Sequence, residues 1–217
     1  MKNKGKLLNK KIGLICLPGF LLPLQAKVLV DDESANARNM EIIEVYAQKR
    51  AQKIEEVGIS VSTIKGNDLQ VQHVKDSTEL SVFAPNLKIS QNAAEGTPPA
   101  VNIRGVGLVD YNTANTSPVA MYVDDIAVGS ASNQIVNLFD IEQIDILRGP
   151  QGTLFGRNST GGAILIRSKR PEFEQSGYLS TGIANNNATS VDAMFNSAIS
   201  ENTAVRIALN HQDYDYS

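Results

Sequence analysis

A glycine-rich stretch in the second half of the chain, residues 148–171, has the composition of a ligand-binding loop. It reads RGPQGTLFGRNSTGGAILIRSKRP and carries five glycines in its first part. Phosphate-binding loops require G-x-x-x-x-G-K-[ST], in which the lysine reaches the phosphates. Here Gly156 is followed by Arg157 and Asn158, and the next predicted element is a strand, whereas a dinucleotide fingerprint opens a helix. We therefore interpret the glycines as turn residues with positive φ and close backbone approach, which disfavours a nucleotide site.

Other residues that could do chemistry are few and widely separated. Asp124 and Asp125 could hold a metal ion, but such a pair more often occupies a hairpin turn and faces water. The only two histidines, His73 and His211, fall in different predicted domains, which disfavours a histidine-based metal or catalytic site. Arg104 follows a predicted strand, and a salt-bridged turn residue is favoured over a ligand contact. The sequence predicts neither an enzyme nor a bound cofactor.

The first 26 residues differ from the rest of the chain. A head with five lysines and no acid precedes an apolar stretch that two prolines interrupt and that ends at Ala26. This arrangement predicts a signal peptide, residues 1–26, with cleavage after Ala26. A membrane anchor is a weaker interpretation, since a span needs about 20 apolar residues. A lipoprotein signal at Cys16 is weaker still, because Ile15 stands where a small residue is expected.

Removal of the signal peptide changes the charge of the protein. The whole chain has 20 basic and 23 acidic residues, so loss of the five lysines leaves 15 basic residues and a net charge of −8. An acidic protein disfavours nucleic acid as a partner. Cys16 is the only cysteine, so the mature protein would have no disulfide, catalytic thiol or cysteine metal site. Export without cysteine fits a bacterial envelope protein.

The region 51–171 reads as a small α+β domain. A strand-like alternation ends at Gly66, and Asp76 with Glu79 predicts a short capped helix that stops before Pro85. Further strands follow, including one hairpin, one apolar run just before the glycine-rich stretch and one at the end of it. We expect a small mixed sheet with short helices.

Three segments of about ten residues follow, and this is the length of a membrane-spanning strand. One face of the last two segments carries Val191, Ala193, Phe195, Ile199, Val205, Ile207 and Leu209. The other face carries Asp192, Asn196, Ala198, Arg206, Ala208 and Asn210. This pattern predicts the first antiparallel strands of a transmembrane β-barrel, residues 172–217, although a soluble antiparallel sheet has the same period.

The leader after the predicted cleavage site, residues 27–50, contains a brief extended run that begins at Met40. Residues 27–39 are polar and expected to be flexible. The run has no partner within the leader, so it could be the first strand of the domain that follows.

Four motifs together resemble those of TonB-dependent outer-membrane receptors. IEQIDILRGPQGTLFGRNSTGGAILIRSKRP is similar to the hallmark of the family's plug domain, VNIRGVG and VAMYVDDIAVG to two further plug motifs, and EIIEVYAQKR to the TonB box ahead of the plug. The resemblance covers residues 40–171. One departure is Asp125, where the family usually has glycine in the hairpin turn.

The resemblance implies an α+β plug domain, residues 51–171, inside a 22-stranded barrel. The TonB box would consist of Glu41, Ile42, Ile43, Glu44, Val45, Tyr46 and Ala47. The residues that seat the plug against the barrel wall would be Arg148, Gly149, Pro150, Gly152, Gly156, Arg157, Gly161 and Gly162. The two arginines would pair with barrel carboxylates. The other plug motifs contribute Arg104, Gly105, Tyr122 and Asp124.

The resemblance also implies a mechanism and its partners. Because the outer membrane has no ATP, TonB and the inner-membrane energising complex would supply work, with TonB pairing as a strand with the TonB box. The barrel would lie in outer-membrane lipid, with the plug and TonB box facing the periplasm. The expected external ligand is an iron–siderophore complex, with cobalamin, haem or an oligosaccharide as alternatives. The leader has no room for the extra periplasmic signalling domain of some members, which favours a transporter over a transducer.

The length is the main departure from the family. Three strands cannot close a barrel, and an open edge in lipid leaves backbone groups unpaired. We therefore expect a fragment or a truncated reading frame of an active transporter. The alternative is a soluble periplasmic binding or adaptor module made of a plug, and a glycine-loop nucleotide enzyme ranks third.

Overall fold

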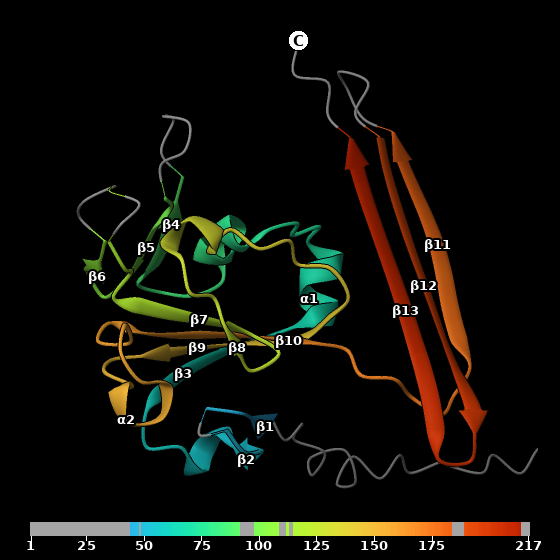
Figure 1. Cartoon of the computed structure of the whole chain (residues 1–217), viewed down its shortest axis with the longest axis horizontal. Coiled ribbons are helices and arrows are strands. Elements are labelled where there is room, and N and C mark those ends of the chain that lie inside the picture. Colours follow the sequence, from blue (N-terminus) through green and yellow to red (C-terminus); the bar gives the residue numbers. More distant parts are fainter. Residues whose placement is uncertain are drawn as a thin grey trace, which may run out of the picture. The chain divides into compact units, whose positions relative to one another are not determined.

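A computed structural model describes residues 44–47, 49–91, 98–108, 112, 115–183 and 189–213 (Figure 1). The predicted signal peptide and residues 27–43 of the leader lie outside the described residues. Within the described part, no helix is both long enough and apolar enough to cross a membrane.

The plug region is built on a five-stranded sheet with the order β3-β9-β10-β7-β8. Its strands are β3 (Ser60–Lys65), β7 (Val119–Val123), β8 (Ile126–Ala127), β9 (Ile141–Arg148) and β10 (Gly162–Ser168). β9 pairs antiparallel with β3 and β10, and β10 pairs parallel with β7, so the sheet is mixed. Residues 144–148 of β9 are buried without alternation, because other elements cover both faces of the strand.

Short elements lie on each face of this sheet (Figure 1). Between them and the sheet lie two apolar cores. One core contains residues of α1 (Gly66–Val71), η3 (Ser77–Val82), β4 (Leu87–Ser90) and β5 (Ala100–Ile103), together with Ile144 and Ile146 of β9. β6 (Val106–Gly107) pairs with β5. The second core contains Leu147 of β9 and residues of β1 (Glu44–Val45) and α2 (Gly152–Phe155). β2 (Gln52–Lys53) and η2 (Ile54–Glu56) follow β1, and η4 (Ala131–Asn133) follows β8.

The predicted α+β plug fold is confirmed, with one helix of a different type. β3 ends immediately before Gly66, as predicted. The helix capped by Asp76 forms as the 3-10 helix η3, and the Asp76 side chain accepts a hydrogen bond from the Thr78 amide. The packed region begins at β1, ahead of the predicted plug boundary at Ala51, because β1 contributes to the second core.

The hairpin between β7 and β8 turns at two aspartates. Asp124 and Asp125 have φ angles of +47° and +66°, which aspartate tolerates better than most residues. The Asp124 carboxylate accepts hydrogen bonds of 2.8 Å from the Ser168 amide and hydroxyl. The turn therefore forms with Asp125 at the position where the resemblance led us to expect glycine.

The final three strands form an antiparallel meander. They are β11 (Ser176–Ile183), β12 (Thr189–Ser200) and β13 (Thr203–Asp213), in the order β11-β12-β13. The predicted antiparallel strands after the plug are confirmed, and the described residues contain no closed barrel.

Candidate functional site

The described end of the predicted TonB box, residues 44–47, is packed on the plug. β1 pairs antiparallel with β2, and the side chains of Val45 and Ala47 are completely buried. Both belong to the core that contains Leu147 and Phe155. The expectation that this segment lies outside the plug is wrong for residues 44–47, because its alternate apolar side chains complete that core.

Polar contacts hold the same segment against β9 and β10. The Tyr46 amide donates to Oδ2 of Asp145 at 3.1 Å, and Gln143 Nε2 donates to the Glu44 carbonyl at 2.9 Å. The guanidinium carbon of Arg167 lies 3.3 Å from the centre of the Tyr46 ring. Contacts of these kinds contribute about 0.5–3 kcal/mol each to stability. The segment is therefore held both by the buried side chains of Val45 and Ala47 and by these polar contacts.

Asp145 is the residue that sequence reasoning missed at this site. It is 3% exposed, and its Oδ1 also accepts from Thr63 Oγ1 at 2.7 Å and from Gln143 Nε2 at 2.8 Å. The signal that could have found it is a single acid between two isoleucines in a buried strand. Such an acid needs several donors to offset the cost of burial.

The glycine-rich loop is closed by its own backbone. The Gly149 amide donates to the Gly161 carbonyl at 3.1 Å, and the Gln151 amide donates to the Ser159 carbonyl at 2.8 Å. The single turn of α2 lies between these contacts. Since two of its amides are already bonded within the loop and β10 follows it, the loop lacks the layout of a phosphate cradle.

The structure requires glycine at different positions of the loop for different reasons. Positive φ angles occur at Gly149 (+92°), Gly156 (+70°) and Gly162 (+149°), which confirms the predicted positive φ at these three positions. Gly162 is the first residue of β10 rather than a turn residue. A Cβ on Gly161 would lie 3.1 Å from the Val106 side chain, so this position needs close approach. At Gly152 no atom lies within 4 Å of an added Cβ.

Arg148 points into the plug. It is 7% exposed, and its guanidinium donates to the Pro85 carbonyl at 3.2 Å and to Ser62 Oγ at 2.7 Å. Burial lowers the pKa of the Arg148 guanidinium, and the nearby charge of Arg104 lowers it further. Because other elements cover both faces of β9, these contacts of Arg148 lie inside the domain. Its pairing with a barrel carboxylate stays a prediction. Arg157 and Pro150 are exposed.

The remaining predicted motif residues support turns and packing. Arg104 and Gly105 form the turn between β5 and β6, with φ angles of +52° and +79°. The Tyr122 hydroxyl donates to the Phe155 carbonyl at 2.7 Å, and the two rings meet edge to face at 5.2 Å. The contact between Tyr122 and Phe155 connects the central sheet to α2, which covers it.

An ion pair joins the plug to the final strands. Arg206 on β13 donates to both carboxylate oxygens of Asp140, which immediately precedes β9. Asn196 on β12 binds the backbone of Glu172 and Glu174 in the linker before β11. In this pair the strands supply the cation and the plug supplies the acid. The sequence placed Asn196 and Arg206 on the polar face but gave no partner for either.

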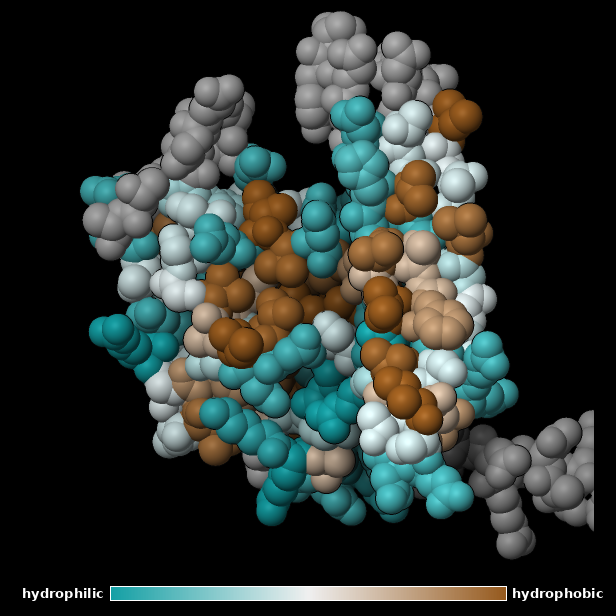
Figure 2. Space-filling model, turned by 45° about the vertical axis from the view of Figure 1, so that its right-hand side comes forward, coloured by the Kyte–Doolittle hydropathy of each residue, from teal (hydrophilic) through white to brown (hydrophobic). Residues whose placement is uncertain are grey.

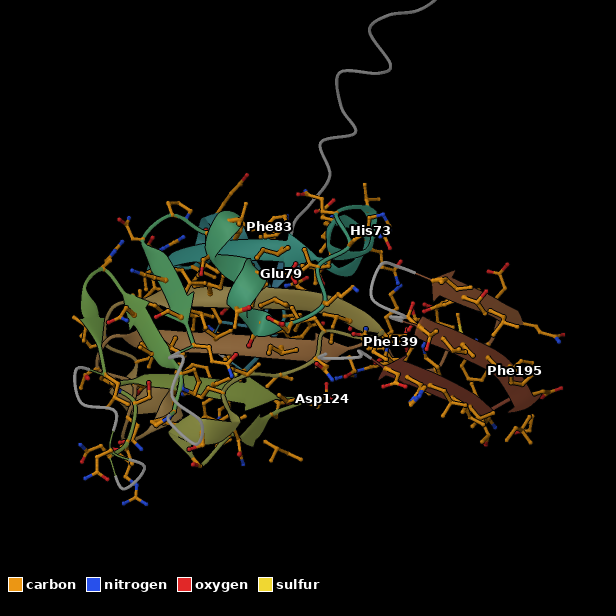
Figure 3. The ribbon with its side chains drawn as sticks, turned by 90° about the horizontal axis from the view of Figure 1, so that it is seen from above. His73, Glu79, Phe83, Asp124, Phe139 and Phe195 are labelled. Carbon is orange, nitrogen blue, oxygen red and sulfur yellow. The ribbon has the colours of Figure 1, made fainter. Side chains whose placement is uncertain are left out.

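The two faces of the final strands differ as predicted. The exposed apolar side chains are Leu179, Ile183, Val191, Phe195, Ile199, Ile207 and Leu209. Figure 2 shows apolar side chains gathered over these strands, with polar ones toward the lower end. On the other face, Tyr178, Asp192 and Asn210 line a cavity of about 870 Å³ together with His73 and Phe139 of the plug region. Figure 3 places His73 and Phe139 on the side of the plug that faces the strands, and Phe195 on the strands themselves.

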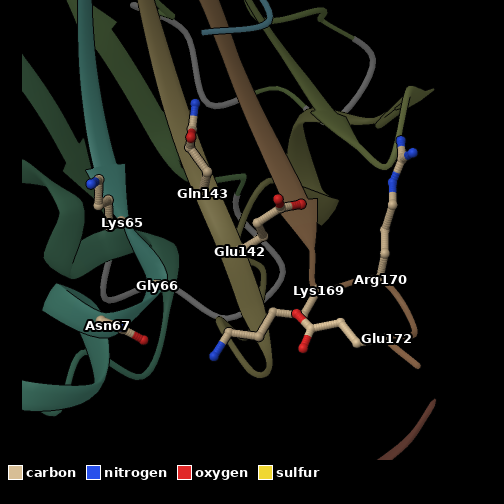
Figure 4. Close-up of a pocket in the computed structure, with 8 residues that line it drawn as sticks. All are labelled: Lys65, Gly66, Asn67, Glu142, Gln143, Lys169, Arg170 and Glu172. Atoms are coloured by element: carbon tan, nitrogen blue, oxygen red, sulfur yellow. The ribbon is translucent and has the colours of Figure 1, made fainter. Parts of the chain in front are cut away.

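A second depression lies at the end of the sheet where the linker begins (Figure 4). Its volume is about 350 Å³, and its lining residues are Lys65, Gly66, Asn67, Glu142, Gln143, Lys169, Arg170 and Glu172. Charges of both signs alternate around it, so it favours neither an anion nor a cation. Among the residues that the structure describes, no group of three or more potential metal ligands occurs.

Comparison with protein families gives one match for the plug region. Residues 53–163 match the model described as the TonB-dependent receptor plug domain. The match includes the glycine-rich loop and the β7–β8 hairpin, and it stops before the final strands.

Curated relatives share the region and extend well beyond it. The pesticin receptor of Yersinia enterocolitica is 30% identical over 173 residues, which are 78% of this chain and 24% of the relative. The ferrioxamine receptor of the same organism is 26% identical over 148 residues, 68% of this chain and 20% of the relative. The vitamin B12 transporter BtuB of Vibrio vulnificus is 25% identical over 142 residues, 64% of this chain and 22% of the relative. This chain therefore spans about a quarter of the length of such relatives.

Solved structures have the same fold. The ferric yersiniabactin uptake receptor FyuA of Yersinia pestis aligns with a TM-score of 0.64 and 26% identity, covering 71% of this chain and 24% of that chain. FpvA of Pseudomonas aeruginosa, bound to pyoverdine, aligns with a TM-score of 0.67 at 15% identity, covering 79% of this chain and 22% of that chain. The second alignment supports the fold alone.

Proposed function

Because this chain belongs to the family of TonB-dependent receptors, we propose that it is the N-terminal part of an outer-membrane importer of iron–siderophore complexes. Members of this family are transporters rather than enzymes. The names of the relatives support the cargo, since they include a ferrioxamine receptor and a ferric yersiniabactin uptake receptor. A vitamin B12 transporter is also among them, so cobalamin is the alternative cargo.

The observation that carries this proposal is the sequence of a plug followed directly by two-faced strands. β11–β13 expose apolar side chains on one face and turn polar side chains toward the plug. This distribution suits lipid outside and a hydrophilic lumen inside. We infer that the strands lie in the outer membrane and that the plug closes the lumen. The N-terminal segment then faces the periplasm.

Energy coupling is assigned to residues 41–47. TonB gains main-chain hydrogen bonds by adding a strand to this segment, whose β-branched and aromatic side chains suit an extended conformation. Residues 44–47 must first leave the plug, because Val45 and Ala47 are buried there. Exposing a buried valine costs about 1.5–3 kcal/mol. Ligand binding above the plug and pairing with TonB would together supply this free energy.

The variant Ile43→Pro tests the coupling role in the full-length receptor. Proline removes one backbone donor and fixes φ, so it interrupts an added strand at its centre. We expect uptake of the ferric siderophore to be abolished while binding of the same ligand at the cell surface is retained. Both quantities are measured on the same cells with labelled ligand.

Val45→Asp is the matched variant that separates coupling from folding. It places a carboxylate in the second core, so we expect receptor level, surface binding and uptake to fall together. If Ile43→Pro shows this same combined loss, the segment is a structural strand. If it transports at the wild-type rate, residues 41–47 are not the coupling element.

A further inference from the structure

A polar junction connects the start of β9 and the linker before β11 to the inner face of β12 and β13. We propose that this junction, formed by Asp140, Arg206, Asn196 and the backbone of residues 172–174, is a fixed anchor. It keeps β9 and β10 against the barrel wall throughout transport, while the N-terminal part of the plug, beginning with residues 44–47, is displaced. The inference rests on the transport function proposed above.

The first contact of the anchor is a bidentate ion pair. Arg206 donates from Nε and Nη2 to the two carboxylate oxygens of Asp140, at 2.6 and 2.5 Å. Each side chain is 8% exposed. Opening such a pair is costly, because each largely covered partner would lose two charge-assisted hydrogen bonds at once. The Asp140 carbonyl also accepts from the Lys169 amide at 2.9 Å, so the end of β10 is joined to the same point.

The second contact is made by an asparagine amide. Asn196 is completely buried, and its Oδ1 accepts from the Glu172 amide at 3.0 Å. Its Nδ2 donates to the carbonyls of Glu172 and Glu174 at 2.9 and 2.7 Å. The Asn196 side chain thus uses its acceptor oxygen and both of its amide hydrogens in hydrogen bonds to the linker. Asn196 lies directly opposite Arg206 in the β12–β13 register, so the two contacts form one cluster.

The strand β9 connects this cluster with the coupling segment. Asp140 immediately precedes β9, and Gln143 and Asp145 on the same strand hold residues 44–47. A pull on the segment therefore acts on a strand whose start is attached to the wall. β9 is paired along its length with β3 and β10, whereas β1 pairs with β2 through two residues. The shorter ladder with fewer buried contacts is expected to separate first.

Cross-linking tests whether the junction stays closed during transport. In the full-length receptor, Asp140→Cys and Arg206→Cys are joined by a short, reducible, bifunctional thiol reagent. The only natural cysteine of this chain, Cys16, lies in the predicted signal peptide. We expect the cross-linked receptor to bind the ferric siderophore and to import it at the rate measured after reduction. A receptor that binds ligand but imports it only after reduction would overturn the proposal.

Charge reversal provides a second measurement that needs no cross-link. Arg206→Asp places a second carboxylate beside Asp140 and directly opposite Asn196, so it should open the junction and loosen the linker that Asn196 holds. We then expect a glutamate-specific protease to cut at Glu172 or Glu174 about tenfold faster than in the unchanged receptor. Adding Asp140→Arg should restore resistance. Gln212→Asp, on the same face of β13, is the control and should leave cleavage unchanged. Equal cleavage of Arg206→Asp and the control would contradict an anchor at this pair.

The anchor and the proposed function fail in different experiments. Normal uptake by Ile43→Pro would contradict the coupling segment without affecting the protease result. Loss of uptake that is specific to the cross-linked state would contradict the anchor and leave the importer function intact.

Discussion

At the scale of single residues, the charged side chains of β9 serve the plug itself. Asp145 collects donors from Tyr46, Thr63 and Gln143, and the Arg148 guanidinium donates to Ser62 and a backbone carbonyl. Both charges are buried, and each has hydrogen-bond partners that reduce the cost of burial. Asp145 therefore has a double role, since it satisfies the sheet and also holds the segment assigned to coupling.

Gly162 is the loop glycine least able to accept a side chain. Its φ is +149°, and an added Cβ would lie 2.3 Å from the Leu147 carbonyl oxygen. We expect Gly162→Ala to lower the free energy of unfolding by about 2–4 kcal/mol, measured by urea denaturation with circular dichroism. Gly152→Ala is the matched control, because the space around it is open, and it should change stability by less than about 0.5 kcal/mol. Equal effects at the two positions would contradict the role given to Gly162.

At the scale of elements, the period of two decides what each face of the final strands contacts. Ile207 and Leu209 on β13 are exposed, while Asn210 on the other face bonds to Asp192 of β12 at 2.5 Å. The plug strand β9 has no such alternation, because it is covered on both sides. A β-strand thus occurs here both in a buried setting, as β9, and with one exposed face, as β13. The pattern of apolar and polar side chains distinguishes the two settings.

Charge placed on the two faces of β13 should have opposite consequences. Leu209→Arg puts a cation on the face assigned to lipid, at a cost of about 2–4 kcal/mol near the bilayer centre. We expect less assembled full-length receptor in outer-membrane fractions, measured by heat-modifiable mobility on gels. Gln212→Arg lies on the inner face of the same strand and should assemble at the normal level. If both variants assemble equally well, the outer face does not contact lipid.

At the scale of the whole molecule, two differently stabilised parts follow one another in the chain. The plug encloses two apolar cores with its own elements. The final strands carry a row of exposed apolar side chains that no described residue covers. The first part is stabilised by burial within the protein, whereas the second, in the proposed function, places its apolar outer face in lipid.

The predicted export signal belongs to this scale, because it decides which membrane the strands can reach. The lysine-rich head and apolar stretch predict a mature N-terminus near Lys27. We expect N-terminal sequencing of the envelope-localised receptor to begin at or near this residue. Protein that is found in the outer membrane and still begins at Met1 would refute the predicted cleavage.

Sequence alone was sufficient for the local features of this protein. The turn at Asp124 and Asp125, the positive φ angles in the glycine-rich loop and the two faces of β12 and β13 follow from side-chain type and spacing. These properties depend on neighbours within a few residues, so they can be predicted without the fold. The family motifs extended the prediction to the order of the elements and to the α+β class.

Only the tertiary structure decided which distant residues are partners. It placed Val45 and Ala47 in the plug core, directed Arg148 to Ser62 and joined Asp140 to Arg206. Each of these contacts joins residues far apart along the chain, and several acids or cations in the sequence could have filled the same role. The choice depends on strand order and register, because a shift by one residue moves every side chain of a strand to the opposite face.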